Sequence, residues 1–194
     1  MAERRTVMLT DPRALRAMAH PTRLELIGLL RRGGPLTATQ AAERIGESPA
    51  SCSFHLRQLA KYGLVEEAGG GRGRERPWRA TAISTEWPVV AENEETRAAG
   101  EMLSRVVVER YFESAVEWLE RQPTEPPEWA EAALIGDAQV EMTAEEMGEV
   151  EARIRELLEP YLKRLEDRSP AVPGSRPVSI IALAFPLAEP EREG

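Results

Sequence analysis

The sequence predicts a protein of the α+β class, mainly α with a small β content, in which an N-terminal unit is followed by a long helix and a strand-helix-strand C-terminal unit. Three observations lead to this prediction. The first third contains short segments with apolar residues at helical spacing, bounded by helix caps and glycines. Two short β-type segments then flank a glycine-rich tip. Residues 92–122 continue as one helical pattern of about eight turns.

The composition describes a chain large enough for one domain with an extension. It has 194 residues, and 42% of them are hydrophobic. No apolar run approaches the ~20 residues of a membrane span, and the first residues contain no apolar signal segment. The single cysteine excludes an internal disulfide. We therefore expect a cytoplasmic protein with no membrane partner.

Charge divides the chain into two unlike parts. Residues 1–82 contain 14 lysines and arginines against 8 acidic residues, a net charge of +6. Residues 83–194 contain the other 11 against 25, a net charge of −14, and the two parts together give −8. A basic unit joined to an acidic one is typical of a head that meets phosphate on a body that repels it. Chance clustering of solvated charge is the alternative.

The first helices should follow a flexible N-terminus at residues 1–10. One helix is predicted to begin at Asp11, because an N-cap acceptor followed by proline is a common helix start. A His-Pro pair at residues 20–21 interrupts the pattern. A second helix then covers residues 22–30, with leucine and isoleucine at helical spacing.

The next two helices are joined by a short turn. Thr37 and Gln40 form a capping box that opens one helix, and Gly46 ends it. Ser48 caps the following helix, with proline at its first position, within about the 3 to 4 residues of a helix-turn-helix turn. Gly63 supplies the left-handed residue that ends this helix.

The helix that starts at Ser48 has two faces of different character. Small and apolar residues share the inner stripe: Cys52, Leu56, Leu59 and Gly63. The outer stripe carries an aromatic ring and two cations: Ala50, Phe54, Arg57 and Lys61. No carboxylate lies on this outer stripe, which favours a helix that meets DNA. From this segment alone, an ordinary amphipathic helix is the alternative.

A β-hairpin with a basic tip follows. Residues 64–67 and 77–82 are short strand-type segments, and the run G-G-G-R-G-R-E-R lies between them. Arginines on such a glycine-rich tip suit insertion into a narrow, electronegative minor groove. Trp78 is expected to pack beneath the hairpin.

Four segments, taken in order, resemble the winged helix-turn-helix domain of the ArsR-type bacterial transcriptional regulators. They are A-H-P-T-R-L-E-L-I-G-L-L (19–30), L-T-A-T-Q-A-A-E-R-I (36–45), S-P-A-S-C-S-F-H-L-R-Q-L (48–59) and G-L-V-E-E (63–67). The resemblance covers roughly residues 11–82, and its most specific parts are P-T-R-L and S-x-H-L-x-x-L followed by G-L-V. It implies a DNA-binding domain over residues 11–84 and a dimerising helix after the wing.

The resemblance and the helical wheel together imply which residues contact DNA. Base edges are expected to face Ala50, Ser51, Ser53 and Phe54. The DNA backbone and the groove beside the wing are expected to meet Thr37, Thr39, Gln40, Arg57, Lys61, Arg72, Arg74 and Arg76. Family members commonly carry a histidine or another polar residue at the position of Phe54, so the family's base preference does not carry over. Arg23 would approach the backbone or pair with Glu25 or Glu43.

The helix at residues 92–122 is predicted to be the dimerisation helix. One apolar stripe on it is the expected dimer interface: Leu103, Val107, Tyr111, Ala115 and Trp118. Val108, Phe112 and Leu119 widen this stripe, so the helix should cover two surfaces, its own domain and the same helix of a second chain. Prolines from residue 123 onward stop the helix.

Residues 130–187 are predicted to form the strand-helix-strand unit. Residues 134–142 alternate between an apolar and a polar side. Thr143 and Glu146 form a second capping box. It opens a helix to about residue 167 whose inward residues are expected to be Met147, Val150, Ile154, Leu157, Tyr161 and Leu165. After a proline-rich link, residues 178–185 form a second apolar strand, and residues 188–194 are a flexible tail.

Metal sensing and catalysis find little support among the residues. The soft ligands are Cys52, His20 and His55; Cys52 lies on the inner stripe, and the histidines have no companions at ligand spacing. The many carboxylates look like solvated helix faces. The glycine-rich tip lacks the strand-to-helix context of a phosphate-binding loop, and no nucleophile pairs with a base. We therefore expect no metal, no cofactor and no enzymatic activity.

The sequence thus predicts a sequence-specific transcriptional regulator, a repressor, that binds an inverted-repeat operator in double-stranded DNA as a homodimer. It is not expected to respond to metals through thiolate or histidine sites. The alternatives are a winged-helix adaptor that binds a protein and an architectural protein that binds DNA without sequence preference. An effector, either a small organic ligand or a protein, is expected between the long helix and the C-terminal unit, near Tyr111, Trp118, Val140 and Tyr161.

Overall fold

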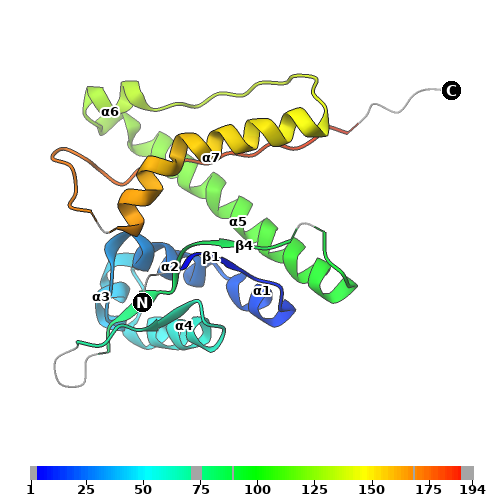
Figure 1. Ribbon diagram of the computed structural model, residues 1–194. Helices are drawn as coiled ribbons and strands as arrows, with labels where there is room; N and C mark the ends of the chain where they lie inside the picture. The colour runs from blue at the N-terminus through cyan, green and yellow to red at the C-terminus, as the bar shows by residue number, and fades with distance from the viewer. Residues whose placement is uncertain (1–3, 71–75, 89, 168, 189–194) are drawn as a thin grey trace.

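A computed structural model of the chain describes residues 4–70, 76–88, 90–167 and 169–188. It is mainly helical with two small sheets, as the sequence predicts. Figure 1 shows two bodies joined by one diagonal helix, α5; the N-terminal body holds α1–α4 and both sheets. In chain order the elements are β1 (Arg4–Met8), α1 (Pro12–Met18), α2 (Pro21–Gly33), α3 (Ala38–Ile45), α4 (Pro49–Lys61), β2 (Val65–Glu67), β3 (Trp78–Ala80), β4 (Ala82–Glu86), α5 (Glu94–Arg121), η1 (Gln122–Thr124), α6 (Pro127–Ala132) and α7 (Ala144–Glu166).

The helices of the N-terminal body begin and end where the sequence signals predict. Asp11 caps α1 by accepting a hydrogen bond of 2.8 Å from a backbone N–H two residues on. Thr37 and Gln40 form the capping box of α3, and Ser48 caps α4. Gly46, with a φ of 72°, is the left-handed residue that ends α3 and turns the chain toward α4.

One enclosed core holds the N-terminal body together. Its largest fully buried side chains come from α1, α2, α4, α5 and the segment around β2: Leu15, Leu26, Ile27, Cys52, Leu56, Leu59, Leu64, Val65 and Leu103. Full burial of one leucine or isoleucine contributes roughly 1.5–3 kcal/mol. This cluster is therefore the main source of stability in the N-terminal body.

The predicted hairpin is present. β2 pairs antiparallel with β3. Leu36 adds a bridge to Trp78 through two backbone hydrogen bonds of 3.0 and 2.8 Å, and the Trp78 ring packs against the core, as expected. The basic tip, with Arg72 and Arg74, lies outside the described residues.

The prediction that residues 1–10 are flexible is wrong for the described part of that segment. Residues 4–8 form β1, which pairs parallel with β4. The hydroxyl oxygens of Thr6 and Ser84 lie 2.7 Å apart, and Leu9 is buried in the core. These two strands are 78 residues apart along the chain, so no local pattern announces their pairing.

The helix α5 belongs to both bodies. Its first half packs against α1 and α2, where Thr96 and Ala99 are buried. The sequence places Leu103 in a dimer interface, but its side chain is fully enclosed in the core of its own chain. Val107 also packs partly against this core. Farther along, the exposed large apolar residues of α5 are Tyr111, Phe112, Val116 and Leu119.

The C-terminal body contains the predicted helix but not the predicted strands. α7 begins at the capping box of Thr143 and Glu146. Residues 134–142 and 178–185 form no ladder, and their backbone groups make no hydrogen bond within the described chain. A strand needs a neighbour to satisfy its N–H and C=O groups, and neither segment has one among the described residues. The short α6 is an addition to the predicted elements.

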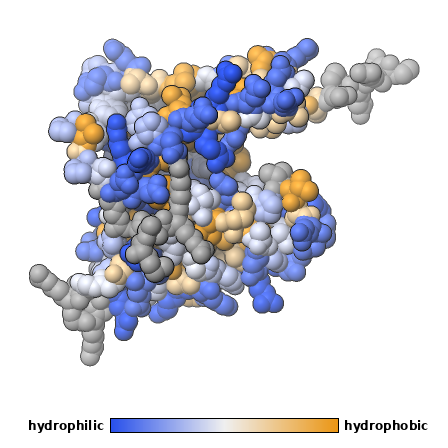
Figure 2. Space-filling view, in the orientation of Figure 1, coloured by the Kyte–Doolittle hydropathy of each residue, from blue (hydrophilic) through white to orange (hydrophobic). Residues whose placement is uncertain are grey.

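The apolar face of α7 is only partly covered. Of the six residues expected to face inward, three are half-buried: Met147, Ile154 and Leu165. The other three are exposed: Val150, Leu157 and Tyr161. No described residue after Leu103 is buried. Figure 2 shows the molecule hollowed on the side where the two bodies diverge, with apolar side chains scattered over the C-terminal body.

Candidate nucleic-acid interface

The exposed side of α4 is the candidate site, and its buried side fixes its position. Cys52, Leu56 and Leu59 are fully buried, and α4 packs against α2 and α3. The hydroxyl of Ser48 accepts a hydrogen bond of 3.1 Å from the backbone N–H of Ser51, which caps the first turn. Because one stripe of α4 is held in the core over its whole length, the opposite stripe faces solvent in a defined orientation.

The first two turns of α4 present the residues expected to read bases. Ala50 is exposed, and Phe54 keeps 50% of its surface open to solvent. Ser51 and Ser53 are half-buried beside them, and no described residue forms a hydrogen bond with either hydroxyl. An open aromatic ring can meet a thymine methyl group, and a free hydroxyl can bond either kind of base edge.

Two cations on the same face are uncompensated. Arg57 and Lys61 are exposed, and neither forms an ion pair with a residue that the structure describes. Lys61 Nζ lies 5.5 Å from the centroid of the Tyr62 ring. Both side chains are therefore free to neutralise phosphate, which releases counterions from DNA.

Two of the residues at the start of α3 that are expected to contact DNA also cap the first turn of that helix. Thr37 Oγ1 accepts a hydrogen bond of 3.2 Å from the Gln40 N–H, and Gln40 Oε1 accepts one of 2.9 Å from the Thr37 N–H. Thr39 and Gln40 are exposed, so the side-chain amide nitrogen of Gln40 can still donate to a phosphate.

The described part of the wing is less basic than its sequence suggests. Arg76 Nη1 lies 2.9 Å from a carboxylate oxygen of Glu67, and Arg79 lies 2.7 Å from Glu66. Both arginines are thus paired across the hairpin. Arg76 would have to leave Glu67 to bind phosphate, and the other two wing arginines, Arg72 and Arg74, fall within residues 71–75, outside the described chain.

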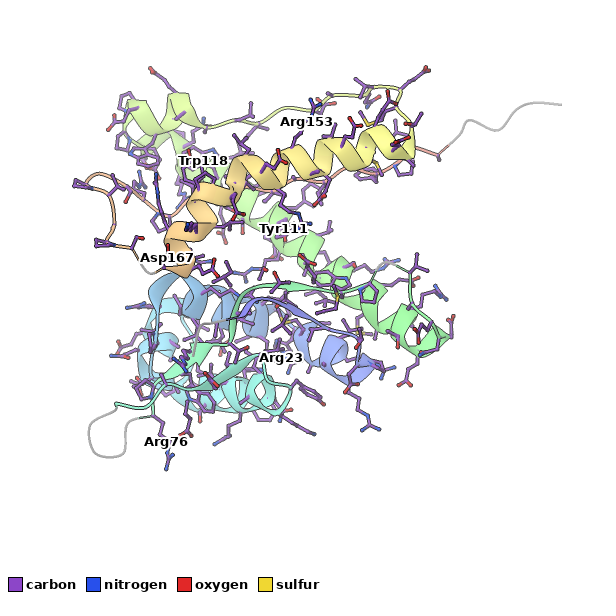
Figure 3. All side chains as sticks on the ribbon, viewed as in Figure 1. Arg23, Arg76, Tyr111, Trp118, Arg153 and Asp167 are labelled. Atoms are coloured by element: carbon purple, nitrogen blue, oxygen red, sulfur yellow. The ribbon has the colours of Figure 1, made fainter. Side chains whose placement is uncertain are left out.

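A basic pocket lies beside α4. Its cavity of about 310 Å³ is lined from α1, α2 and α4 by Arg13, Arg16, Ala17, Arg23, Gln58 and Tyr62. Arg16 forms an ion pair of 2.8 Å with Glu95. In the described chain Arg13 and Arg23 form none, and Arg23 Nε is buried without a hydrogen-bond partner. Figure 3 shows Arg23 within the N-terminal body and Arg76 at the hairpin.

The sequence leaves open whether Arg23 approaches the DNA backbone or forms a salt bridge with Glu25 or Glu43. Neither Glu25 nor Glu43 forms an ion pair with Arg23 among the described residues, so the structural salt bridge is not seen. Sequence reasoning singles out Arg23 but misses the rest of the pocket. The spacing of Arg13 and Arg16, three residues apart on one helix face, is the signal that points to it.

Two histidines, one of them on the buried side of α4, pack against each other. His20, at the N-cap of α2, and His55 have ring centroids 4.5 Å apart. Burial lowers the pKa of both imidazoles, and the positive charge of Arg23 lowers them further. Burial also raises the pKa of the Cys52 thiol, which lies in the core. Within the described chain no group of three or more His, Cys, Asp or Glu residues could hold a metal ion.

The residues expected in the dimer interface and the effector site lie where α5 meets the C-terminal body. Figure 3 shows Tyr111 and Trp118 on the part of α5 that reaches this body. Ala115 and Trp118 are half-buried. Val140 and Tyr161 are exposed, so a single chain does not enclose the four side chains expected around an effector.

Comparison with known proteins identifies part of the N-terminal body. Residues 18–68, from the end of α1 to just after β2, match a family described as a helix-turn-helix domain. No curated protein matches the sequence. No helix in the described chain is both long enough and apolar enough to cross a membrane.

Two solved structures are similar at low levels. Reduced HlyU from Vibrio cholerae is 23% identical over 48% of this chain and 84% of its own, with a TM-score of 0.31. The MarR family protein Rv2887 of Mycobacterium tuberculosis, in complex with salicylic acid, is 19% identical over 76% of this chain and 87% of its own, with a TM-score of 0.28. Both TM-scores are below 0.5, so neither similarity bears on function. The helix-turn-helix match supports a DNA-binding transcriptional regulator.

Proposed function

We propose that this chain is a sequence-specific transcriptional regulator that reads double-stranded DNA through α4 and acts as a homodimeric repressor on an inverted repeat. The observation that carries the proposal is the exposed face of α4. A helix locked into the core presents an open aromatic ring, together with two hydroxyls and two cations that have no partner among the described residues. The helix-turn-helix match supports it, and the four resembling segments favour the ArsR type.

In this proposal the start of α4 specifies the sequence. Ala50, Ser51, Ser53 and Phe54 face base edges in the major groove, where each base pair presents a distinct pattern. Phe54 offers apolar contact and no hydrogen bond. We therefore expect it to favour a thymine methyl group over a guanine edge.

The surrounding cations fix the position of the protein on the duplex. Arg57 and Lys61 meet phosphates that flank the groove, and the exposed residues of α3 meet the same strand. We add the basic pocket to this set. Within the described chain Arg13 and Arg23 form no ion pair there, and Gln58 places the pocket on the flank of α4, so it suits a backbone phosphate.

Dimerisation supplies the symmetry of the operator. Two copies of α4 in successive major grooves would lie about 34 Å apart. Leu103 and Val107 serve the core of their own chain, so we place the interface farther along α5, at Tyr111, Phe112, Ala115, Val116, Trp118 and Leu119. Phe112 has 63% of its surface exposed in the single chain, which a second copy would cover.

Any effector is proposed to act on the C-terminal body. Tyr111, Trp118, Val140 and Tyr161 are not enclosed by one chain, so an organic ligand bound there would need walls from the second copy. Such a ligand would couple to DNA binding by changing the separation of the two α4 helices.

The test is selection from a randomised pool of duplex DNA by the full chain at two salt concentrations, followed by sequencing. We expect one inverted repeat to be enriched, more strongly at the higher salt. Retention without sequence preference would indicate an architectural protein. No retention would indicate an adaptor for another protein, and either result would overturn the proposal.

A matched pair of variants locates the reading face in the same experiment. Phe54→Ala should change the selected sequence, because Phe54 is open at the start of α4. Thr81→Ala serves as the control, because Thr81 directly follows β3, away from the exposed face of α4 in sequence, and its hydroxyl donates to the Gly63 carbonyl at 2.7 Å. It should leave the selected sequence unchanged.

A further inference from the structure

The basic pocket beside α4 is lined by charges of one sign. Three of its lining residues are arginines, and none of the described lining residues is acidic: Arg13, Arg16, Ala17, Arg23, Gln58 and Tyr62. The chain as a whole has the opposite balance, with 33 acidic residues against 25 basic ones. A concave surface lined by cations attracts anions and repels other cations. The pocket is therefore suited to a negatively charged ligand.

Two of the three arginines have a charge that no carboxylate balances. Arg13 and Arg23 form no ion pair with any described residue. Arg16 does pair with Glu95 at 2.8 Å, but both side chains are exposed. Exposed pairs of this kind contribute little to stability, so Arg16 can turn toward a ligand at low cost. The pocket thus offers two free positive charges and a third that is available.

Arg23 has the strongest need for a counterion. Its Nε atom is buried and has no hydrogen-bond partner among the described residues. Burial lowers the pKa of its guanidinium, which means that water solvates the charged form poorly. Opposite charges attract more strongly where water is scarce. An anion in the pocket would therefore stabilise the charged form of Arg23.

The pocket has room for more than an anionic group. Its volume of about 310 Å³ is at the lower end of the range of small-molecule sites, which is roughly 300–1,000 Å³. The half-buried side chains of Gln58 and Tyr62 complete its lining. An aromatic ring offers apolar surface to an organic group, and an amide can both donate and accept hydrogen bonds. These features suit a small organic anion.

The number of free charges favours one class of anion. Arginine presents a planar fork of N–H donors that fits the oxygens of a phosphate group. A phosphodiester of the DNA backbone carries one negative charge, whereas a phosphate monoester carries about −1.5 to −2 at pH 7. The charges of Arg13 and Arg23 together balance a monoester. A diester would leave one of them unbalanced.

We infer that the basic pocket binds a small organic phosphate monoester, which competes there with the DNA backbone and lowers the affinity of the chain for DNA. The competition rests on the proposed function, in which the same pocket takes a backbone phosphate, whereas binding of the ester needs no DNA. Figure 3 shows Arg23 in the N-terminal body and Trp118 on the part of α5 that reaches the C-terminal body. This ligand is therefore distinct from an effector of the C-terminal body.

Isothermal titration calorimetry of the full chain without DNA tests binding of the ester. The probe is phenyl phosphate at about pH 7.5, where a phosphate monoester is mostly dianionic. Phenyl sulfate is the matched ligand, because it has the same ring and a single negative charge. We expect phenyl phosphate to bind about tenfold more tightly or better, since it can engage both free arginines.

Three variants locate the ligand. Arg23→Gln and Arg13→Gln should each weaken the binding of phenyl phosphate about tenfold, because each removes one of the two free charges. Arg13 is exposed, so its variant tests the pocket even if Arg23→Gln disturbs the packing. Arg32→Gln is the matched control, since it makes the same change at an exposed position of α2 outside the pocket. It should leave binding unchanged.

Fluorescence anisotropy with the selected duplex tests the competition. Phenyl phosphate should release the duplex from the parent chain and from Arg32→Gln, and phenyl sulfate at equal ionic strength should not. Equal binding of the two esters, or binding that Arg13→Gln and Arg23→Gln leave unchanged, overturns the ligand site while the proposed DNA binding stands. Binding of the ester without release of the duplex overturns the competition. A chain that binds the ester and no duplex overturns the proposed function alone.

Discussion

The two halves of the chain differ in where their apolar residues lie. Up to Leu103 the buried apolar residues form one enclosed core, and beyond it no described residue is buried. The halves have similar ingredients, since helix caps, amphipathic stripes and strand-type segments occur in both. The halves differ in whether the segments that their apolar residues pack against lie within the same chain. The N-terminal body finds its partners within the chain, even across the 78 residues that separate β1 from β4.

This contrast has a functional consequence. A body with its own core can hold α4 in one orientation, which DNA reading requires. A body without such a core would gain order from the proposed association with a second chain, and its state could then respond to that chain or to an effector. We therefore expect the N-terminal half to determine which sequence is read and the C-terminal half to determine when it is read.

The largest effect is expected from a change in the enclosed core. Leu56→Ala removes a fully buried side chain of α4 and should lower the free energy of unfolding by about 2–5 kcal/mol. Chemical denaturation at two protein concentrations measures it. The loss should be the same at both, because the contacts lie within one chain. A loss below about 1 kcal/mol would show that the core is loosely packed.

The next effect tests the uncovered half. Phe112→Ser should raise the dissociation constant of the dimer at least tenfold, by about 1.4 kcal/mol or more, because the exposed ring is proposed to pack on a second copy. Glu113→Ser, on the neighbouring exposed position, is the matched control and should leave the constant unchanged. Sedimentation velocity measures both. Equal behaviour of the two variants would move the interface elsewhere.

A change on the reading face should alter specificity and leave folding intact. Phe54→Ala should change the preference between selected and unselected duplexes by about 1–3 kcal/mol. Fluorescence anisotropy at fixed salt measures the preference. An equal loss of affinity for every duplex would place base reading on other residues.

Removing a cation beside the exposed face of α4 should alter how DNA affinity depends on salt concentration. Arg57→Ala and Arg23→Gln should each flatten the slope of log affinity against log salt by about one unit, because each removes one phosphate contact. Arg76→Gln should do less, since Arg76 is paired with Glu67 in the free protein. If Arg23→Gln leaves the slope unchanged, the basic pocket does not hold phosphate.

The smallest effect concerns pH. The pKa values of His20 and His55 are lowered in the folded protein from an ordinary value of 6.5, mainly by burial. The unfolded chain therefore binds more protons as pH falls through 6.5, and the free energy of unfolding decreases on acidification. Above that pH these groups have little influence. In a variant carrying His20→Gln and His55→Gln, the free energy of unfolding should decrease less between pH 7 and pH 5. An unchanged decrease would show that other groups cause it.

Local signals made the N-terminal body predictable. The Thr37–Gln40 capping box and Gly46 depend on neighbours in sequence, so a pattern of a few residues fixes them. β1 was missed because its partner is distant. The basic pocket was missed because three helices bring its side chains together. Both depend on tertiary contacts that no short window contains.

The C-terminal body shows the opposite error. The alternation at residues 134–142 and the apolar run at 178–185 predict strands, yet no ladder forms. Likewise, half of the apolar residues expected to face inward on α7 are exposed. An apolar side-chain pattern predicts which face of a segment is buried. It does not indicate whether the same chain or another one buries it. In the proposed dimer a second copy would supply part of this cover.

The mass of the full chain in solution tests the central claim most directly. Light scattering across nanomolar to micromolar concentrations should give about 43 kDa, twice the 21.6 kDa of one chain, because a second copy is proposed to cover the C-terminal half. A stable mass of 21.6 kDa at micromolar concentration would contradict the account. The exposed apolar residues of α5 and α7 would then need a partner of another kind.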